Sequence, residues 1–143
     1  MMKLETFSYL TKKVNEYIMI TSDVDDAVAR SGIKKGLVAV IVAHTTCGIT
    51  VNEGLPCVEK DLAALFERLV PLEDDYAHAH FLPSYGATGN NSQGHLKSAL
   101  TGNHCLFPVV DGKVVRGGAQ DIYLVEYDGP QRRKVFVEVL GDE

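Results

Sequence analysis

The residues 36–43, GLVAVIVA, form an uninterrupted apolar run that ends at His44. A run of this length without polar alternation is typical of a β-strand buried on both faces. It is far shorter than the roughly 18 apolar residues that a membrane-spanning helix needs. The run therefore predicts a buried strand in a globular domain, with His44 delivered at its end.

The rest of the chain is rich in strand signals, with helical patterns between them. Strands are expected at residues 4–10, 14–21, 36–43, 49–52, 104–110, 113–116, 122–127 and 134–140. Helices are expected at residues 22–31, 56–70 and 93–100. The first two strands are expected to pair as a hairpin, and Asp111-Gly112 predicts a two-residue turn. These signals predict an α+β fold: a predominantly antiparallel β-sheet sandwich with about three short helices, forming a single domain over residues 1–143.

Composition narrows the possible partners. The 14 Lys and Arg residues against 19 Asp and Glu residues give a net charge of −5, which argues against a nucleic-acid partner but not against a small anionic ligand. The three cysteines are odd in number and form no CxxC pair, so we expect reduced thiols. No apolar leader follows the first methionine, and we expect a cytoplasmic protein with no membrane partner.

Three of the five histidines fall where binding sites are usually assembled. His44 ends a strand, His78 lies in the aperiodic segment 71–93, and His95 begins a helix. Imidazoles from separate elements can together hold a divalent cation and leave positions open for substrate. The alternatives are a hydrogen-bonded histidine at the strand end and solvent-facing histidines in the loop. His80 belongs to the same segment, and His104, on an apolar strand, is expected to be a packed or edge residue.

Other polar residues could support such a site. Glu53 follows a strand and could orient an imidazole, although a solvated loop acid is an equal alternative. Lys97 lies near a helix start, where an anion would be favoured. Arg116 precedes two glycines and could hold a phosphate, with an ordinary bulge or turn as the alternative.

Several segments together resemble the YjbQ-like family, also called the secondary thiamine-phosphate synthase family. They are HTTCGITVNE at 44–53, YAH at 76–78, GHLKSALTG at 94–102, GGAQDI at 117–122 and DGP at 128–130. The resemblance covers nearly the whole chain and implies a compact, β-rich homotrimer. His44, His78 and His95 match family positions, which implies a metal or anion site, whereas His80 and His104 do not match.

The resemblance also implies an activity. The leading hypothesis is a transferase that condenses a pyrimidine pyrophosphate with a thiazole phosphate and releases pyrophosphate. A zinc or magnesium ion held by His44, His78 and His95 would neutralise the leaving group. Glu53 would orient a histidine, and the substrate or its phosphates would contact three further residues. These are Lys97, Arg116 and Gln120.

Two alternatives remain open. One is a metal-dependent hydrolase of a small phosphorylated metabolite, and the other is a non-catalytic trimer that binds a small anionic ligand. The chain also departs from the family pattern. Ala119 replaces the usual tryptophan, and Asn90-Asn91 replace acidic residues that often precede the histidine-lysine element. The amides remove charge that could bind a cation or accept a proton.

Overall fold

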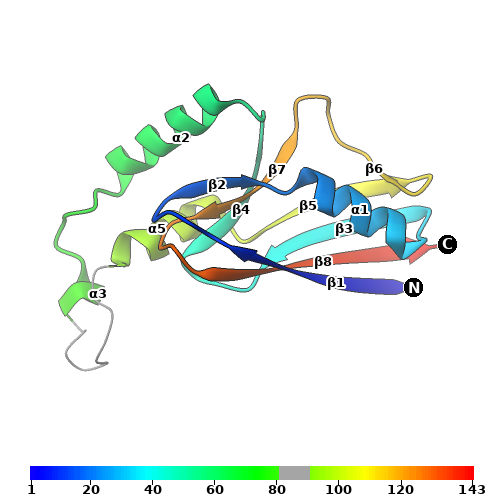
Figure 1. Ribbon diagram of the computed structural model, residues 1–143, viewed down its shortest axis with the longest axis horizontal. Helices are drawn as coiled ribbons and strands as arrows, with labels where there is room; N and C mark the ends of the chain where they lie inside the picture. Colours follow the sequence, from blue (N-terminus) through cyan, green and yellow to red (C-terminus); the bar gives the residue numbers. More distant parts are fainter. Residues whose placement is uncertain (81–90) are drawn as a thin grey trace.

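Two antiparallel sheets build the protein (Figure 1). The computed structural model describes residues 1–80 and 91–143. The larger sheet has the order β1-β8-β3-β5-β6, with bounds Met2–Leu10, Arg132–Asp142, Lys35–Val42, His104–Val110 and Lys113–Val114. The smaller sheet has the order β2-β7-β4, with bounds Glu16–Met19, Asp121–Glu126 and Cys47–Asn52. The predicted antiparallel α+β domain is therefore confirmed.

The core lies between the inner face of the larger sheet, the smaller sheet and the helix α1, Thr21–Ser31. Valines alternate along β3, so that Val38, Val40 and Val42 point into this core. The prediction that the strand is buried on both faces is wrong, because Leu37 on the opposite face is 48% exposed. The run is continuous in the sequence because the outer face is also apolar.

The predicted hairpin between the first two strands is also wrong. β1 pairs with β8, and β2 pairs with β7 in the other sheet. The intervening segment passes from one sheet to the other, and the Thr11 N–H donates to the Gln131 carbonyl. The hairpin at 111–112 is confirmed, since Asp111 (φ 52°) and Gly112 (φ 74°) both have the positive φ that a tight type I′ turn needs.

The helices follow the predicted order. α1 ends at Gly32, whose φ of 73° is in the left-handed region, and α2 spans Pro56–Leu69 with proline in its first turn. α5 spans Ser92–Thr101, and the single turn α3, Ala77–His80, lies within the segment predicted to be aperiodic. The rest of that segment, residues 81–90, lies outside the described residues. Within the described chain, no helix has the length and apolar character to span a bilayer.

Candidate functional site

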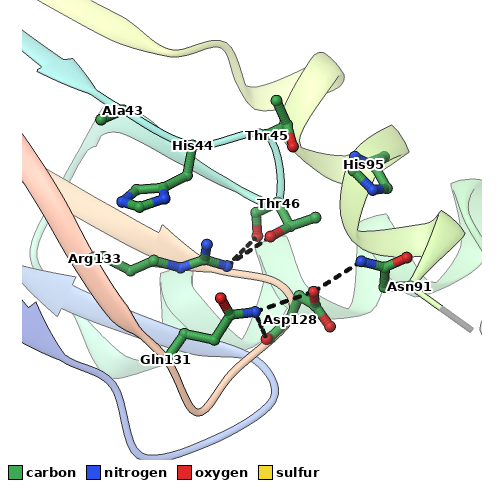
Figure 2. A pocket seen from close by; sticks show the side chains of 9 residues that line it. All are labelled: Ala43, His44, Thr45, Thr46, Asn91, His95, Asp128, Gln131 and Arg133. Atoms are coloured by element: carbon green, nitrogen blue, oxygen red, sulfur yellow. Dashed lines mark hydrogen bonds between the residues drawn. The ribbon is translucent and has the colours of Figure 1, made fainter. Parts of the chain in front are cut away.

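A cavity of about 730 Å³ opens where three segments of the chain meet (Figure 2). The turn that follows β3 contributes residues 43–46, and the start of α5 contributes Asn91 and His95. The connection from β7 into β8 contributes Asp128 and Gln131, and the start of β8 contributes Arg133. Two of the sequence-predicted histidines, His44 and His95, therefore line one cavity. They lie on opposite sides of it in Figure 2.

The floor of this cavity is a buried ion pair. Arg133 is 2% exposed, and its Nε donates to Glu126 Oε1 at 2.8 Å while its Nη2 donates to Glu126 Oε2. Nη2 also donates to Thr46 Oγ1 at 2.7 Å. Burial opposes the charge of Arg133, but its hydrogen bonds to Glu126 and the nearby negative charge raise the pKa of this guanidinium above its ordinary value. Nη1 has no hydrogen-bond partner among the described residues.

Glu126 also fixes the connection that carries Asp128. Its Oε2 accepts the backbone N–H groups of Tyr127 at 3.1 Å and of Asp128 at 3.0 Å. Its Oε1 accepts the Thr11 hydroxyl at 2.7 Å. One fully buried carboxylate thus joins three segments beside the cavity: the one at Thr11, the one at residues 127–128 and the start of β8.

His44 is a hydrogen-bonded histidine at the strand end. The Lys134 backbone N–H donates to His44 Nε2 at 2.8 Å, so the neutral ring carries its proton on Nδ1. Burial, followed by the positive charge of Arg133, lowers the pKa of His44. In this arrangement His44 offers a hydrogen-bond donor and has no free lone pair for a metal.

The imidazole rings of His78 and His95 pack against each other edge to face. Their ring centroids lie 5.1 Å apart at an interplanar angle of 88°. Both rings line a second cavity of about 400 Å³, together with Tyr76, Ser92 and Leu96. His95 therefore lines both cavities.

Asn91 determines the tautomer of His78. Its Nδ2 donates to Asp128 Oδ2 at 3.0 Å, and its Oδ1 lies 2.8 Å from His78 Nε2. A carboxylate can only accept, so the amide must present its oxygen to His78, and Nε2 must carry the proton. The neutral His78 ring therefore keeps its lone pair on Nδ1, and Asp128 and Asn91 hold the ring in place. Asn90, the other predicted departure, lies outside the described residues.

Several sequence-predicted residues lie away from this cavity. Glu53 follows the far end of β4, roughly 20 Å of extended chain from the histidine end. Lys97 is 3% exposed and pairs with Glu67 of α2. Arg116 lines a separate cavity of about 480 Å³ beside α1 and β6 and donates to the Gln120 carbonyl at 3.0 Å. β6 and α5 lie at opposite ends of the molecule (Figure 1).

The sequence interpretation missed Arg133, Glu126 and Asp128. The basic triplet 132–134 is more typical of a solvated hairpin end. The signal that could have identified Arg133 is its register, because positions 133, 135, 137 and 139 alternate and the last three are buried valines. An arginine at such a position is buried, and it needs a carboxylate partner.

The predicted metal site stays a prediction. Within residues 1–80 and 91–143, no three His, Cys, Asp or Glu side chains come together closely enough to hold a cation. The set of three histidines does not fit as it stands, because the lone pair on His44 Nε2 accepts the Lys134 N–H. His78 and His95 fit as a pair, since they are adjacent and the lone pair on His78 Nδ1 is not used by Asn91.

The fold and the cavity together define a small antiparallel α+β domain whose polar site is assembled from three separate segments. A model of the family described as "UPF0047 protein YjbQ-like" matches residues 5–142, and the chain belongs to that family. The chain is 34% identical to UPF0047 protein MJ1081 of Methanocaldococcus jannaschii over 134 residues, 93% of this chain and 91% of the relative. It is 33% identical to UPF0047 protein YugU of Bacillus subtilis, over 96% of this chain and 99% of the relative.

Solved structures agree with this assignment. A crystal structure from Sulfolobus solfataricus, described as a YbjQ-like protein of unknown function, matches with a TM-score of 0.90 at 31% identity and covers 99% of both chains. A YjbQ/UPF0047 family protein from Clostridium acetobutylicum matches with a TM-score of 0.86 at 35% identity, over 95% of this chain and 99% of that one. These names state no activity, so the activity implied by the resemblance stays a prediction.

Proposed function

We propose that the cavity between His44, His95 and Arg133 binds the phosphate group of a small metabolite and supports group transfer at that phosphate. The observation that carries the proposal is the buried guanidinium of Arg133, which lines an open cavity with Nη1 unpaired among the described residues. Arginine presents donors that match phosphate oxygens. The Nδ1–H of His44 adds a second donor on the same side of the cavity.

The opposite wall of the cavity offers acceptors. The carboxylate of Asp128 receives the Asn91 amide and the Gln131 amide on its Oδ2, and it favours a ligand that carries a donor or a positive group near its phosphate. His78 has its Nδ1 lone pair available and lies against His95. Through His95, which lines both cavities, this pair adjoins the cavity proposed to hold the phosphate.

A divalent cation, zinc or magnesium, is part of the proposal only at the pair His78 and His95. When bound, it would offset phosphate charge, with ligand oxygens and water as its other partners. His44 acts as a donor to the phosphate and not as a metal ligand. The chain's own residues orient the ligand: Arg133 and His44 donate to its phosphate from one side, and Asp128, held by Asn91, accepts from a donor group of the same ligand on the other.

Titration with inorganic pyrophosphate tests the binding step. His44→Phe removes a donor from the cavity and should weaken pyrophosphate binding about tenfold, the worth of one hydrogen bond. His104→Phe makes the same chemical change on the exposed residue at the start of β5 and should leave the affinity unchanged. Equal affinities in the two variants, or no binding by the natural protein, would refute the proposal.

The reaction type needs a separate assay. The condensation implied by the resemblance predicts thiamine phosphate and pyrophosphate from a pyrimidine pyrophosphate and a thiazole phosphate. The assay is run with added zinc, with added magnesium and with a chelator. Release of phosphate or pyrophosphate without the thiazole acceptor would assign a hydrolase. Saturable binding without turnover in any of these conditions would assign a non-catalytic binding protein.

A further inference from the structure

A separate polar cavity of about 480 Å³ lies at the end of the molecule that carries α1 and β6. α1 contributes Asp25, the hairpin of β5 and β6 contributes Lys113, and the loop that leaves β6 contributes Arg116, Gly117 and Gly118. α5, which helps to form the cavity of Arg133, lies at the opposite end (Figure 1). A small ligand in the cavity beside α1 would therefore be distinct from one held by Arg133.

Arg116 is held in this cavity by contacts on two sides. Its Nη2 donates to Asp25 Oδ2 at 3.1 Å, and its Nη1 donates to the Gln120 carbonyl at 3.0 Å. A guanidinium has several further N–H donors, and the described residues offer them no acceptor. Nε is enclosed by protein, so the donors left for a ligand are the second N–H groups of Nη1 and Nη2.

Gln120 fixes the loop that carries Arg116. The Gln120 N–H donates to the Gly117 carbonyl at 3.1 Å, and Gln120 Oε1 accepts the Gly117 N–H at 2.7 Å. Gly118 leaves the backbone uncovered, because a Cβ at this position would have no other atom within 4 Å. A ligand can therefore approach the backbone closely here, and Gln120 contributes to the cavity by positioning Arg116.

Two lysines add positive charge beside this loop. Within residues 1–80 and 91–143, the ammonium group of Lys113 makes no hydrogen bond or ion pair, although it lines the cavity. Lys34 lies next to the hairpin turn, since a Cβ on Gly112 would be 3.5 Å from Lys34 Nζ. Asp25 offsets the charge of Arg116 only. The cavity therefore keeps an excess of positive charge in a chain whose net charge is −5.

We propose that this cavity is a second anion site, which holds the phosphate group of a small phosphate ester between Lys113 and Arg116. A phosphate monoester carries about −1.5 to −2 charges at pH 7, and both arginine and lysine donate readily to its oxygens. The cavity volume of about 480 Å³ lies in the range of roughly 300–1,000 Å³ that is typical of metabolite pockets, and a phosphate group alone would leave most of it empty. Oδ1 of Asp25 accepts no hydrogen bond from the described residues, so it can accept one from a hydroxyl or amino group of the ester. This site does not depend on the function proposed for the cavity of Arg133.

An NMR titration of the ¹⁵N-labelled protein locates phosphate binding residue by residue. Inorganic phosphate and phosphoethanolamine should each shift the amide signals of Gly117 and Gly118 in a saturable way. Lys113→Met should weaken this binding about tenfold, because it removes one charged contact. The substitution breaks no contact within the described chain, so the variant should fold normally. Lys60→Met makes the same change on an exposed lysine of α2 and should leave the affinity unchanged.

The same spectra separate this site from the cavity of Arg133. His44→Phe should change only the shifts around residues 43–46 and 128–133, and the shifts of Gly117 and Gly118 should stay as in the natural protein. Tighter binding of phosphoethanolamine than of inorganic phosphate would assign the site to an ester with a donor group, and equal affinities would assign it to free phosphate. Shifts confined to the cavity of Arg133 would overturn the proposal. Equal effects of Lys113→Met and Lys60→Met would also overturn it, because the binding would then depend on overall charge and not on this cavity.

Discussion

Replacing Glu126 with glutamine tests how the cavity floor is held together. Glu126 is fully buried, and its two oxygens accept five hydrogen bonds from Thr11, Arg133, Tyr127 and Asp128. The glutamine keeps the shape but replaces one acceptor oxygen with an NH₂ group and removes the charge that offsets Arg133. At least one Arg133 donor is then left without an acceptor in a buried position.

The expected loss in the free energy of unfolding is large. Removing one partner of a buried ion pair costs about 3–5 kcal/mol, because the remaining charge stays desolvated. Domains of this size are stable by about 5–15 kcal/mol, so the variant should lose a large part of its free energy of unfolding. Urea unfolding at fixed protein concentration measures this loss as a lower midpoint at an unchanged slope.

A double variant and a surface control make the interpretation specific. Glu126→Gln combined with Arg133→Met removes both charges and should recover much of the loss. Glu5→Gln breaks the exposed ion pair with Arg30, whose Nη2 lies 2.7 Å from Glu5 Oε1, and should leave the midpoint close to that of the natural protein. A Glu126→Gln loss below about 1 kcal/mol would refute the view that a desolvated charge dominates here.

Three further predictions concern packing, pH and thiol chemistry. Gly36→Ala should lower the free energy of unfolding by about 3 kcal/mol or more, since its Cβ would lie 1.8 Å from the Leu140 carbonyl oxygen; urea unfolding checks this. The pKa of His44 is lowered in the folded state, so its contribution to stability is present above the unfolded value of about 6.5 and is lost as pH falls through the folded pKa. In the same assay the natural protein should therefore lose more stability than His44→Gln between about pH 7.5 and about pH 5. A thiol reagent at about pH 8 should label Cys57 alone in the folded chain, because burial raises the pKa of Cys47 to about 11 and that of Cys105 to about 12; mass spectrometry identifies the site.

Local sequence signals predict local structure well. Pro56 and the apolar spacing after it indicate the start and the face of α2, and Asp111-Gly112 indicates the tight turn. Strand pairing is harder to predict, because β1 pairs with a strand more than 120 residues away in the chain. Nothing within residues 1–20 specifies that partner, so adjacency along the chain predicts a hairpin that does not form.

Among the site residues, those marked by a local sequence feature are also predictable, and those placed by contacts between distant segments are not. His44 is predictable because a strand end is a local feature, and His95 because it lies in the first turn of a helix. Glu53 is expected nearby because it is only nine residues from His44, yet β4 carries the chain away from the cavity over that distance. Arg133 is missed because its partner, Glu126, lies on another strand, and only their pairing explains how a charge is kept in the core.

Asn91 connects the departure from the family pattern to the chemistry of the cavity. As an amide, it donates to Asp128 and accepts from His78, so the two groups are linked without a cation. An aspartate there would place a second carboxylate about 3 Å from Asp128, a contact that requires a cation or a proton between the two acids. Asn91→Asp should therefore bind Zn²⁺ at least tenfold more tightly than the natural chain, with both histidines of the His78–His95 pair needed for the gain. Calorimetric titration of the chain, of Asn91→Asp and of Asn91→Asp with His95→Ala measures this difference. Equal zinc affinities in all three would mean that the amide does not determine whether this part of the site needs a metal.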